Sequence, residues 1–330
     1  MKGSESRMQG KIPSEHSAET KIYAGIDVCK AWLDVYLHPI GQAFRVANTP
    51  VGLKALKRRL AGMRIGMIVL EATGKFHRLA QRHLHAAGHP VAVVNPQWTY
   101  QFAKAIGQFA KTDRLDARVL ALYGESIRPN ALPPSPEEFE ALQELVNARM
   151  AAMAEQTALS NRQGTSQTAF LKAELTRRLK AIATHIERLE AEIARRVKAD
   201  PVLEHRVELL LTIPGVGLVT AMAMAIGLPE LGSCTGKAAS LLAGLAPLAD
   251  DSGQRTGERY IRGGRASVPC ALYFAALTAS RFNPPLAEDY NRLIAKGKEA
   301  KVALTAIMRK LVVLANTLIT ENRPWQPIQP

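Results

Sequence analysis

Four acidic residues in the N-terminal part of the chain have the types and spacing of metal ligands for phosphoryl transfer. Asp27 closes an apolar run in GIDV, and Glu71 directly follows the apolar run IGMIVL. Asp113 and Asp116 are three residues apart in KTDRLDARVLALY, a spacing that puts both carboxylates on one face of a helix. Carboxylate oxygens are hard ligands that suit Mg²⁺, and two such ions stabilise the attacking and leaving oxygens of a displaced phosphate. The four acids therefore predict a Mg²⁺ site for phosphoryl transfer.

Each acid taken alone also has a structural interpretation. An Asp that follows a strand is often a turn residue, and Asp113 could cap the helix that it begins. Asp116 could pair with Arg114 or Arg118 on the same helix. The metal-site hypothesis therefore depends on a fold that brings the four acids together.

The pattern around these acids predicts an α/β domain. Three strand-like runs come first, and helix-like runs then alternate with buried strand-like runs. Three antiparallel strands followed by this alternation is the order of an RNase H-like fold, and it places Asp27 and Glu71 at strand ends. We expect strands at 21–28, 31–37, 42–49, 65–70 and 90–95, and helices at 51–62, 74–88, 97–107 and 112–126.

The charge balance favours a polyanionic partner. The 330 residues include 43 Lys and Arg against 29 Asp and Glu, a formal net charge of +14, and nucleic acid is the commonest such partner. Three scattered cysteines without a CxxC pair argue against a zinc ribbon or a disulfide framework and suit a reducing cytoplasm. No apolar run reaches the roughly 20 residues of a membrane span, so we expect no membrane association.

A proline-rich linker and long helices follow the first domain. Apolar residues recur every three or four positions, which predicts a coiled-coil seam. A helical hairpin within one chain is the alternative, but we favour pairing with another chain because the polar remainder leaves little else to cover the seam. The seam residues are Leu171, Leu175, Leu179, Ile182, Ile186, Leu189, Ile193 and Val197.

These patterns divide the chain into five parts. We expect a disordered leader, an α/β domain, a linker with the coiled coil, a mainly helical domain and an irregular tail. The predicted bounds are 1–20, 21–127, 128–200, 201–322 and 323–330.

The start of the helical domain has the pattern of a helix-hairpin-helix. In LTIPGVGLVTA, Gly215 and Gly217 allow a tight turn whose backbone N–H groups can face a phosphate at a helix N-terminus. An ordinary turn between helices is the alternative interpretation.

A glycine- and arginine-rich segment contains a possible nucleophile. Ser252 lies beside Gly253 and is followed by arginines that could steady phosphate charge, although a flexible basic loop explains the same residues. Ser267 competes with Ser252 but begins a predicted helix and is better explained as a cap. The basic residues that we predict to contact nucleic acid, rather than form a solvated face, are Arg255, Arg259, Arg262, Arg265, Lys298, Lys301, Arg309 and Lys310.

The ordered set of motifs resembles the DEDD transposases of the insertion-sequence one-ten family, many of which are bridge-RNA-guided serine recombinases. The resemblance covers roughly residues 22–320. It is carried by GIDVCKAWLDVYL, LEATG, VVNP, KTDRLDARVLA, LTIPGVGLVTA, GLAPLADDSG, GGRASV and GKEAKVALTAIMRKL, in that order.

This resemblance implies an N-terminal RuvC-like domain, a coiled coil and a C-terminal transposase domain. By motif, Asp27, Glu71, Asp113 and Asp116 match the family's metal-binding acids, and Ser252 matches its nucleophilic serine. The resemblance also implies a homo-oligomer, from dimer to tetramer, and a structured RNA that pairs with double-stranded donor and target DNA. One segment, RYIRGGRASV, departs from the lysine–glycine pair of some members and points to another subgroup.

Two other hypotheses explain part of the same pattern. A RuvC-like nuclease would use the four acids to activate water, with Ser252 in a structural role. A non-enzymatic nucleic-acid-binding protein would use the hairpin and the basic helix without chemistry at the acids.

Overall fold

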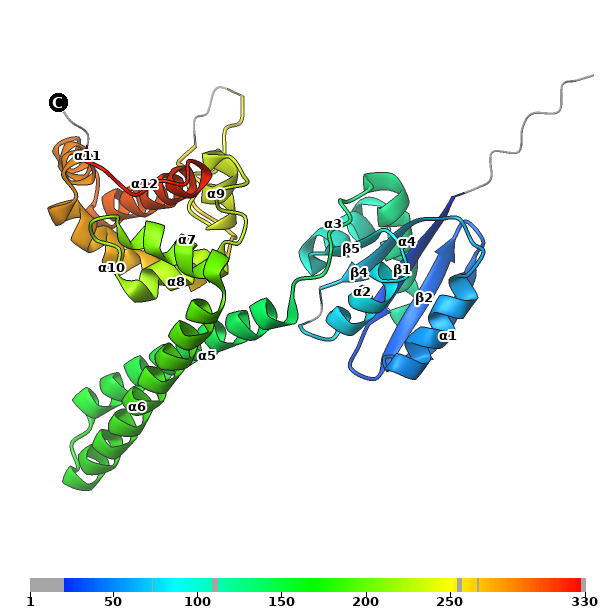
Figure 1. The fold of residues 1–330 in the computed structure, drawn as a ribbon, viewed down its shortest axis with the longest axis horizontal. Coiled ribbons are helices and arrows are strands. Elements are labelled where there is room, and N and C mark those ends of the chain that lie inside the picture. The colour runs from blue at the N-terminus through cyan, green and yellow to red at the C-terminus, as the bar shows by residue number, and fades with distance from the viewer. Residues whose placement is uncertain (1–20, 73, 109–111, 254–256, 266, 328–330) are drawn as a thin grey trace, which may run out of the picture. The chain divides into compact units, whose positions relative to one another are not determined.

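The computed structural model describes residues 21–72, 74–108, 112–253, 257–265 and 267–327, without the side chains of Asp113 and Arg114. The predicted leader, residues 1–20, lies outside these ranges. The chain divides into two compact units, Met1–Ser135 and Pro136–Pro330, which are described separately below (Figure 1). The division falls within the proline-rich linker.

A five-stranded mixed sheet forms the centre of the first unit. Three antiparallel strands lie on one side, and two further strands run parallel to the first strand on its other side. The sheet order is β3-β2-β1-β4-β5. The strands are β1 (Ile22–Val28), β2 (Trp32–His38), β3 (Gln42–Ala47), β4 (Ile65–Glu71) and β5 (Val91–Val94), and the helices are α1 (Pro50–Leu60), α2 (His77–His85), α3 (Pro96–Ala105) and α4 (Asp113–Ile127).

The two faces of this sheet are covered by different helices. Alternate residues of β1, among them Ala24 and Ile26, join a core with the apolar sides of α1 and α2. The residues between them point to the opposite face because side chains alternate along a strand. On that face Val69 and Val94 pack with Leu120 of α4, so α4 lies over the same face as Asp27.

Helix α4 lies unusually close to β1 because Gly25 has no side chain. A Cβ atom at Gly25 would lie 2.0 Å from the Ala117 carbonyl oxygen and 2.3 Å from the Ala121 nitrogen. Farther along α4, a Cβ atom at Gly124 would lie 2.8 Å from Val69 Cγ2 and 3.7 Å from Tyr23 Cδ1. Helix α4 therefore runs antiparallel to β1, with its first turn toward the strand end that carries Asp27.

Gly25→Ala is expected to destabilise the first unit by about 3 kcal/mol or more, because the added methyl group meets backbone atoms that cannot rotate away. Gly66→Ala is the control in the same unit, since the nearest atoms to its added Cβ belong to side chains 3.3 Å and 3.4 Å away. Urea unfolding followed by tryptophan fluorescence measures both, because Trp32 and Trp98 lie in this unit. Equal midpoints for the two variants would contradict the close packing of α4.

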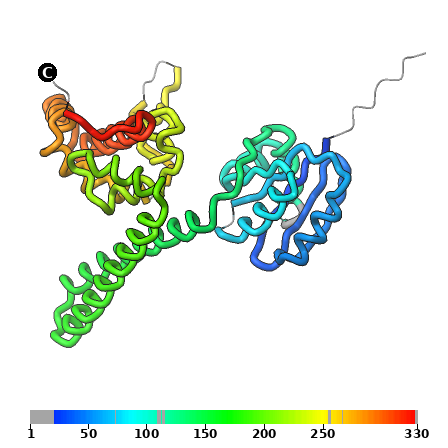
Figure 2. The backbone as a smooth tube through the Cα atoms, in the orientation of Figure 1, coloured from blue at the N-terminus to red at the C-terminus, as the bar shows by residue number. Residues whose placement is uncertain are grey.

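The second unit is helical and begins with a long antiparallel hairpin. Helices α5 and α6 lie side by side, and the remaining helices form a bundle at the hairpin's base (Figures 1 and 2). The α/β first unit and the helical second unit confirm the predicted classes of the two halves. The helices are α5 (Glu137–Thr165), α6 (Ala169–Ala199), α7 (Pro201–Leu211), α8 (Leu218–Gly227), α9 (Gly236–Leu242), α10 (Ser267–Phe282), α11 (Pro284–Ala295) and α12 (Ala300–Thr320).

Packing of α5 against α6 buries only part of the predicted coiled-coil seam on α6. Ile186, Ile193 and Val197 are buried, whereas Leu171 near the hairpin tip is 48% exposed. The hairpin thus accounts for the part of the seam nearest the bundle. Pairing of the seam with another chain stays a prediction.

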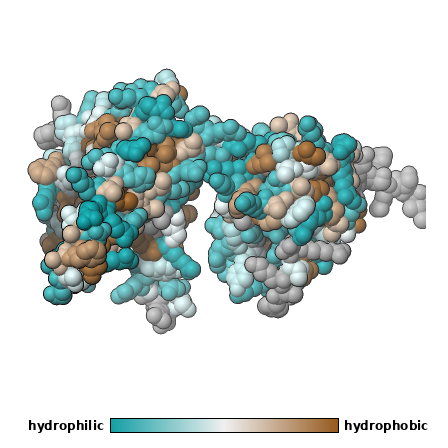
Figure 3. Space-filling view, turned by 90° about the horizontal axis from the view of Figure 1, so that it is seen from below, coloured by the Kyte–Doolittle hydropathy of each residue, from teal (hydrophilic) through white to brown (hydrophobic). Residues whose placement is uncertain are grey.

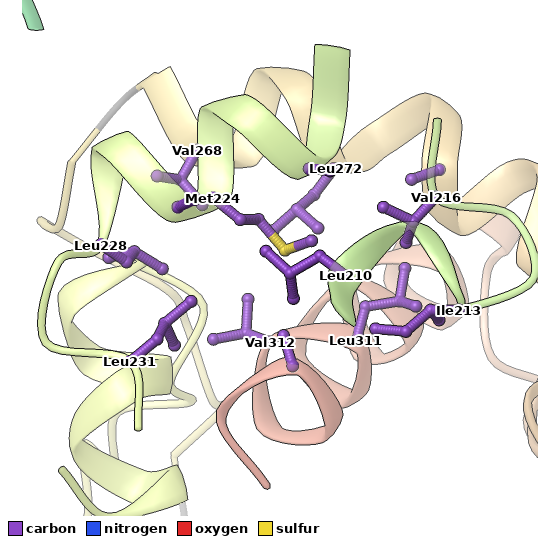
Figure 4. Close-up of a cluster of buried hydrophobic side chains, with 14 of the residues drawn as sticks. Leu210, Ile213, Val216, Met224, Leu228, Leu231, Val268, Leu272, Leu311 and Val312 are labelled. Carbon is purple, nitrogen blue, oxygen red and sulfur yellow. The ribbon is translucent and has the colours of Figure 1, made fainter. Parts of the chain in front are cut away.

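The core of the bundle gathers side chains from helices far apart in the sequence. Leu210 of α7, Met224 of α8, Leu272 of α10 and Leu311 of α12 meet at its centre (Figure 4). Among the described helices, α12 is the one long and apolar enough to cross a membrane, and half of its apolar stretch is buried in the bundle. Its apolar composition is therefore explained by its place in the core. Hydrophilic residues cover most of the face seen in Figure 3, with separate hydrophobic patches between them.

Candidate functional site

The sheet brings Asp27 and Glu71 side by side. Strands β1 and β4 are parallel neighbours, and Ile26 pairs in register with Leu70. Because Ile26 and Leu70 both belong to the core beneath α1 and α2, the residue after each points to the face beneath α4. Asp27 and Glu71, both half-buried, therefore lie level with each other where the two strands end.

The first turn of α4 carries the other two predicted acids to the same edge. Asp116 is half-buried and precedes Ala117, the residue whose carbonyl oxygen packs over Gly25. The helix is capped by Thr112, whose hydroxyl accepts a hydrogen bond from the Leu115 N–H at 3.3 Å. The cap is therefore not Asp113, whose side chain lies outside the described part of the structure.

The oxygen ligands of these residues suit a divalent metal in their chemistry. Carboxylates on neighbouring strands repel each other, and a cation between them is a natural compensation. Among the described side chains, however, no three Asp, Glu, His or Cys residues lie close enough to form a metal-binding group. The segment that leads into α4, residues 109–111, also lies outside the described ranges.

A further carboxylate on this face escaped the sequence analysis. Asp34 of β2 lies directly opposite Asp27 in the antiparallel register. The Arg45 guanidinium donates two hydrogen bonds to it, from Nε to Oδ1 and from Nη2 to Oδ2, each 2.9 Å long. This bidentate pair compensates Asp34 within the protein. The alternation in AWLDVYL could have placed Asp34 on this face, but not its pairing with Arg45.

Thr99 of α3 holds one of the candidate acids in position. Its hydroxyl lies 3.0 Å from Glu71 Oε2 and 3.0 Å from the Pro96 carbonyl oxygen, and the residue is 4% exposed. Helix α3 begins directly after β5, where Asn95 caps it by accepting a hydrogen bond from the Gln97 N–H. Thr99 therefore restricts the rotamers of Glu71 from a buried position.

In the second unit, the turn between α7 and α8 holds the predicted glycines in two different environments. Gly215 has φ +99°, and a Cβ there would lie 2.7 Å from the Ala279 nitrogen of α10. Gly217 is the exposed N-cap of α8, and a Cβ there would meet no described atom within 4 Å. Gly215 is thus required for packing, while the start of α8 at Gly217 is open to an anion.

Ser252 is exposed on a loop, and the residue before it, Asp251, is held by two hydrogen bonds. Asp251 accepts hydrogen bonds from Arg259 Nη1 at 2.7 Å and from the Gly257 N–H at 3.1 Å. The hydrogen bond from Arg259 is the main reason that the pKa of Asp251 lies below its usual value. Gly253 has φ +56°, a left-handed conformation that glycine adopts readily. Arg255 lies outside the described residues.

Some of the basic residues predicted to contact nucleic acid already form ion pairs within the protein, and others are exposed. Arg265 forms a bidentate pair with Glu230, with both N–O distances 2.6 Å, and donates to the Gly227 carbonyl oxygen at 2.8 Å. Burial raises the pKa of Glu230, but the hydrogen bonds from Arg265 help to bring it below its usual value. Lys310 pairs with Asp289. Arg262, Lys298, Lys301 and Arg309 are exposed.

Both halves of the chain match models of transposase families. Residues 24–166 match a family described as transposase and named for its DEDD acids. Residues 207–291 match the family described as transposase IS116/IS110/IS902. The first match contains the candidate carboxylate site, and the second contains the turn between α7 and α8 and Ser252.

Individual relatives are similar over most of the chain or over a large part of it. The pilin gene-inverting protein of Moraxella bovis is 28% identical over 316 residues, which are 93% of this chain and 98% of that protein. A 43.6 kDa protein of insertion element IS110 from Streptomyces coelicolor is 27% identical over 59% of this chain and 47% of its own length. A probable family 20 transposase of Pseudomonas aeruginosa is 25% identical over 62% of this chain and 72% of its own length.

Proposed function

The chain belongs to the IS116/IS110/IS902 family of transposases, and from that premise we propose that it cuts and rejoins DNA, with the carboxylates of its first unit as one half of a composite active site. The observation that carries this proposal is the placement of Asp27 and Glu71 side by side on neighbouring strands. The strand order supports assigning the first unit to the RNase H-like, RuvC-like fold.

Asp27, Glu71, Asp113 and Asp116 would hold divalent metal, with Mg²⁺ the ion that their oxygen ligands suit best. Bound metal at such a site offsets negative charge on the reacting phosphate. Thr99 holds Glu71 in one orientation, and Arg45 keeps the Asp34 carboxylate compensated beside Asp27.

Ser252 is the proposed nucleophile. Its Oγ forms a bond to phosphorus, a P–O bond of the DNA backbone breaks, and the freed strand end receives the proton lost by the serine. Because one phosphoester replaces another, the step can be reversed on a new strand end without a separate energy source. This suits both transposition and DNA inversion, the activity in the name of the Moraxella bovis relative. The exposure of Ser252 supports its role.

A structured guide RNA and a synaptic homo-oligomer of two to four chains complete the proposal. The guide RNA and the homo-oligomer are both implied by the family resemblance. The chain's excess of basic residues supports a nucleic-acid partner. In the first unit, α1 adds the exposed Lys54, Lys57 and Arg58 on one surface. Sequencing the RNA that copurifies with the protein from cells tests this part, and a single enriched structured RNA is the expected result.

One experiment tests the class of reaction. The protein is expressed with the DNA segment that encodes it and its flanking sequences, and the products are separated on a denaturing gel. A covalent protein–DNA adduct together with rejoined DNA is expected. Cut ends without an adduct would support the nuclease hypothesis, and unchanged DNA under conditions where the protein binds it would support a non-enzymatic role.

Thr99→Val is expected to reduce strand cleavage about tenfold and to raise the Mg²⁺ concentration needed for half-maximal rate, because Glu71 loses the hydroxyl that orients it. Valine keeps the branched shape of threonine, so the fold should persist. Thr99→Ser restores the hydroxyl and should recover most of the rate. If both variants show the wild-type dependence on Mg²⁺, Thr99 does not position Glu71.

A further inference from the structure

A groove on the second unit has a combination of side chains that the proposed chemistry does not use. It has a volume of about 510 Å³ and lies where the C-terminal segment crosses the side of α12 near the start of α11. Its lining includes an amide, an apolar side chain, three cations and an indole: Asn283, Leu286, Arg309, Lys310, Arg323 and Trp325.

Asn283 places a buried acceptor at this groove. The residue is 1% exposed, and its Oδ1 atom accepts no hydrogen bond from any residue that the structure describes. Its Nδ2 atom donates to the Pro214 carbonyl oxygen at 3.5 Å, which fixes the direction of the amide. Because a buried acceptor without a donor costs free energy, a ligand that brings an N–H group here gains affinity.

Trp325 places an aromatic ring at the groove. It packs against the core of the bundle, and its backbone N–H donates to Thr212 Oγ1 at 2.8 Å. The preceding turn is fixed by the hydrogen bond from the Arg323 N–H to the Leu318 carbonyl oxygen and by contact of His205 with Asn322. The backbone that carries the indole is therefore fixed at the groove, and the face of an indole suits stacking.

Arg309 supplies a cation that is available to a ligand. Of the three basic side chains in the lining, Lys310 pairs with Asp289 and Arg323 pairs with Glu321. Arg309 is exposed and forms no ion pair with the residues described here. A guanidinium in this state can take a phosphate through two parallel hydrogen bonds.

We infer that this groove binds a single unpaired nucleotide of DNA or RNA, with the base stacked on Trp325 and donating to Asn283 Oδ1 and the phosphate held by Arg309. A base within a duplex would not suit, because its faces are covered by the neighbouring base pairs and cannot stack on Trp325. The bond from Asn283 to Pro214 also places the groove beside the turn that leads to Gly217. The inference rests on the proposed function, since it assumes that nucleic acid follows the second unit past this turn.

The test uses the full chain with Trp32→Phe and Trp98→Phe, so that Trp325 is the fluorescent indole that remains. Six-nucleotide single strands of DNA, of RNA, and of DNA with all bases removed are titrated. We expect the strands with bases to quench Trp325 and to bind about tenfold more tightly than the abasic strand. Stronger quenching by DNA or by RNA at equal saturation identifies which of them supplies the nucleotide.

Variants separate the parts of the proposed site. By fluorescence anisotropy, Trp325→Ala should remove the preference for strands with bases, whereas Trp325→Phe should keep most of it. Arg309→Ala should weaken binding of all strands several-fold more than Lys198→Ala, which removes the same charge from the exposed end of α6. Asn283→Ala should lower affinity for strands with bases alone, with circular dichroism checking that α11 still forms.

Unchanged Trp325 fluorescence at saturation, or equal affinity of intact and abasic strands in all variants, would overturn the inference. The proposed function fails by a different result. Asp27→Asn should leave the quenching intact, so loss of recombination in that variant tests the carboxylate site alone. Binding of intact single strands without a Trp325 response contradicts only the groove.

Discussion

Asp27→Asn is expected to slow DNA strand cleavage by about 10³-fold while leaving DNA binding and the fold intact. The amide has nearly the same shape as the carboxylate but lacks the negative charge that a divalent metal requires. Because Ile26 and Leu70 stay in register, the substituted side chain still lies beside Glu71. The loss should therefore appear in the cleavage rate at saturating DNA and not in affinity for DNA.

Asp34→Asn is the matched control for this variant. Asp34 lies opposite Asp27 on the same face of the sheet and is held by the Arg45 guanidinium. We expect a loss of about tenfold, far below that of Asp27→Asn, because Asp34 would act on the metal only through its neighbours. If both substitutions reduce cleavage equally, the effect comes from the charge of the whole face and the assignment of Asp27 as a ligand is wrong.

Ser252→Ala is expected to abolish the covalent protein–DNA adduct and to reduce recombination by at least about 10⁴-fold. Without the hydroxyl no phosphoester can form at this position, and water offers no route to conserve the energy of the broken bond. Ser252 is exposed and lies outside the described core, so the thermal unfolding midpoint and DNA affinity should match those of the unchanged protein.

The control for the nucleophile is the other serine of this segment. Ser267 is the first residue of α10, and Ser267→Ala should retain both the adduct and the recombined product. Mass spectrometry of the trapped adduct should locate the phosphate on the peptide that contains Ser252. Recombination that persists in Ser252→Ala, with the adduct on another residue, would show that the nucleophile is elsewhere.

The acids at the strand ends could be found from sequence because local patterns determine them. Once a strand is located, the alternation of its side chains determines which face of the sheet its final acid points to. Strands β1 and β4 lie where IYAGIDV and IGMIVL predict them. Their adjacency depends on the RNase H-like strand order, in which the chain returns from β3 through α1 and β4 pairs with β1. Asp27 and Glu71 were therefore within reach of pattern analysis.

The partners of these acids could not be found in the same way. Thr99 is 28 residues from Glu71, and Glu230 is 35 residues from Arg265. No periodicity links such positions, because the contacts arise only when separate elements pack. For the same reason the sequence could not reveal that Arg265 is engaged by Glu230, or that Asn283 lies buried beside Trp325.

The absence of a side chain at Gly25 has a consequence for which metal the protein would prefer. Contact between Gly25 and Ala117 sets the distance of α4 from the sheet, and thereby how far Asp113 and Asp116 stand from the strand ends. Mg²⁺ demands short, nearly octahedral coordination, whereas Ca²⁺ accepts longer bonds and more ligands. If the domain still folded with a larger residue at position 25, α4 would lie farther from the sheet. The four acids would then be spaced more widely, and a metal held between them would no longer be selected against Ca²⁺. Ion selectivity would then be set by a residue that touches no ion.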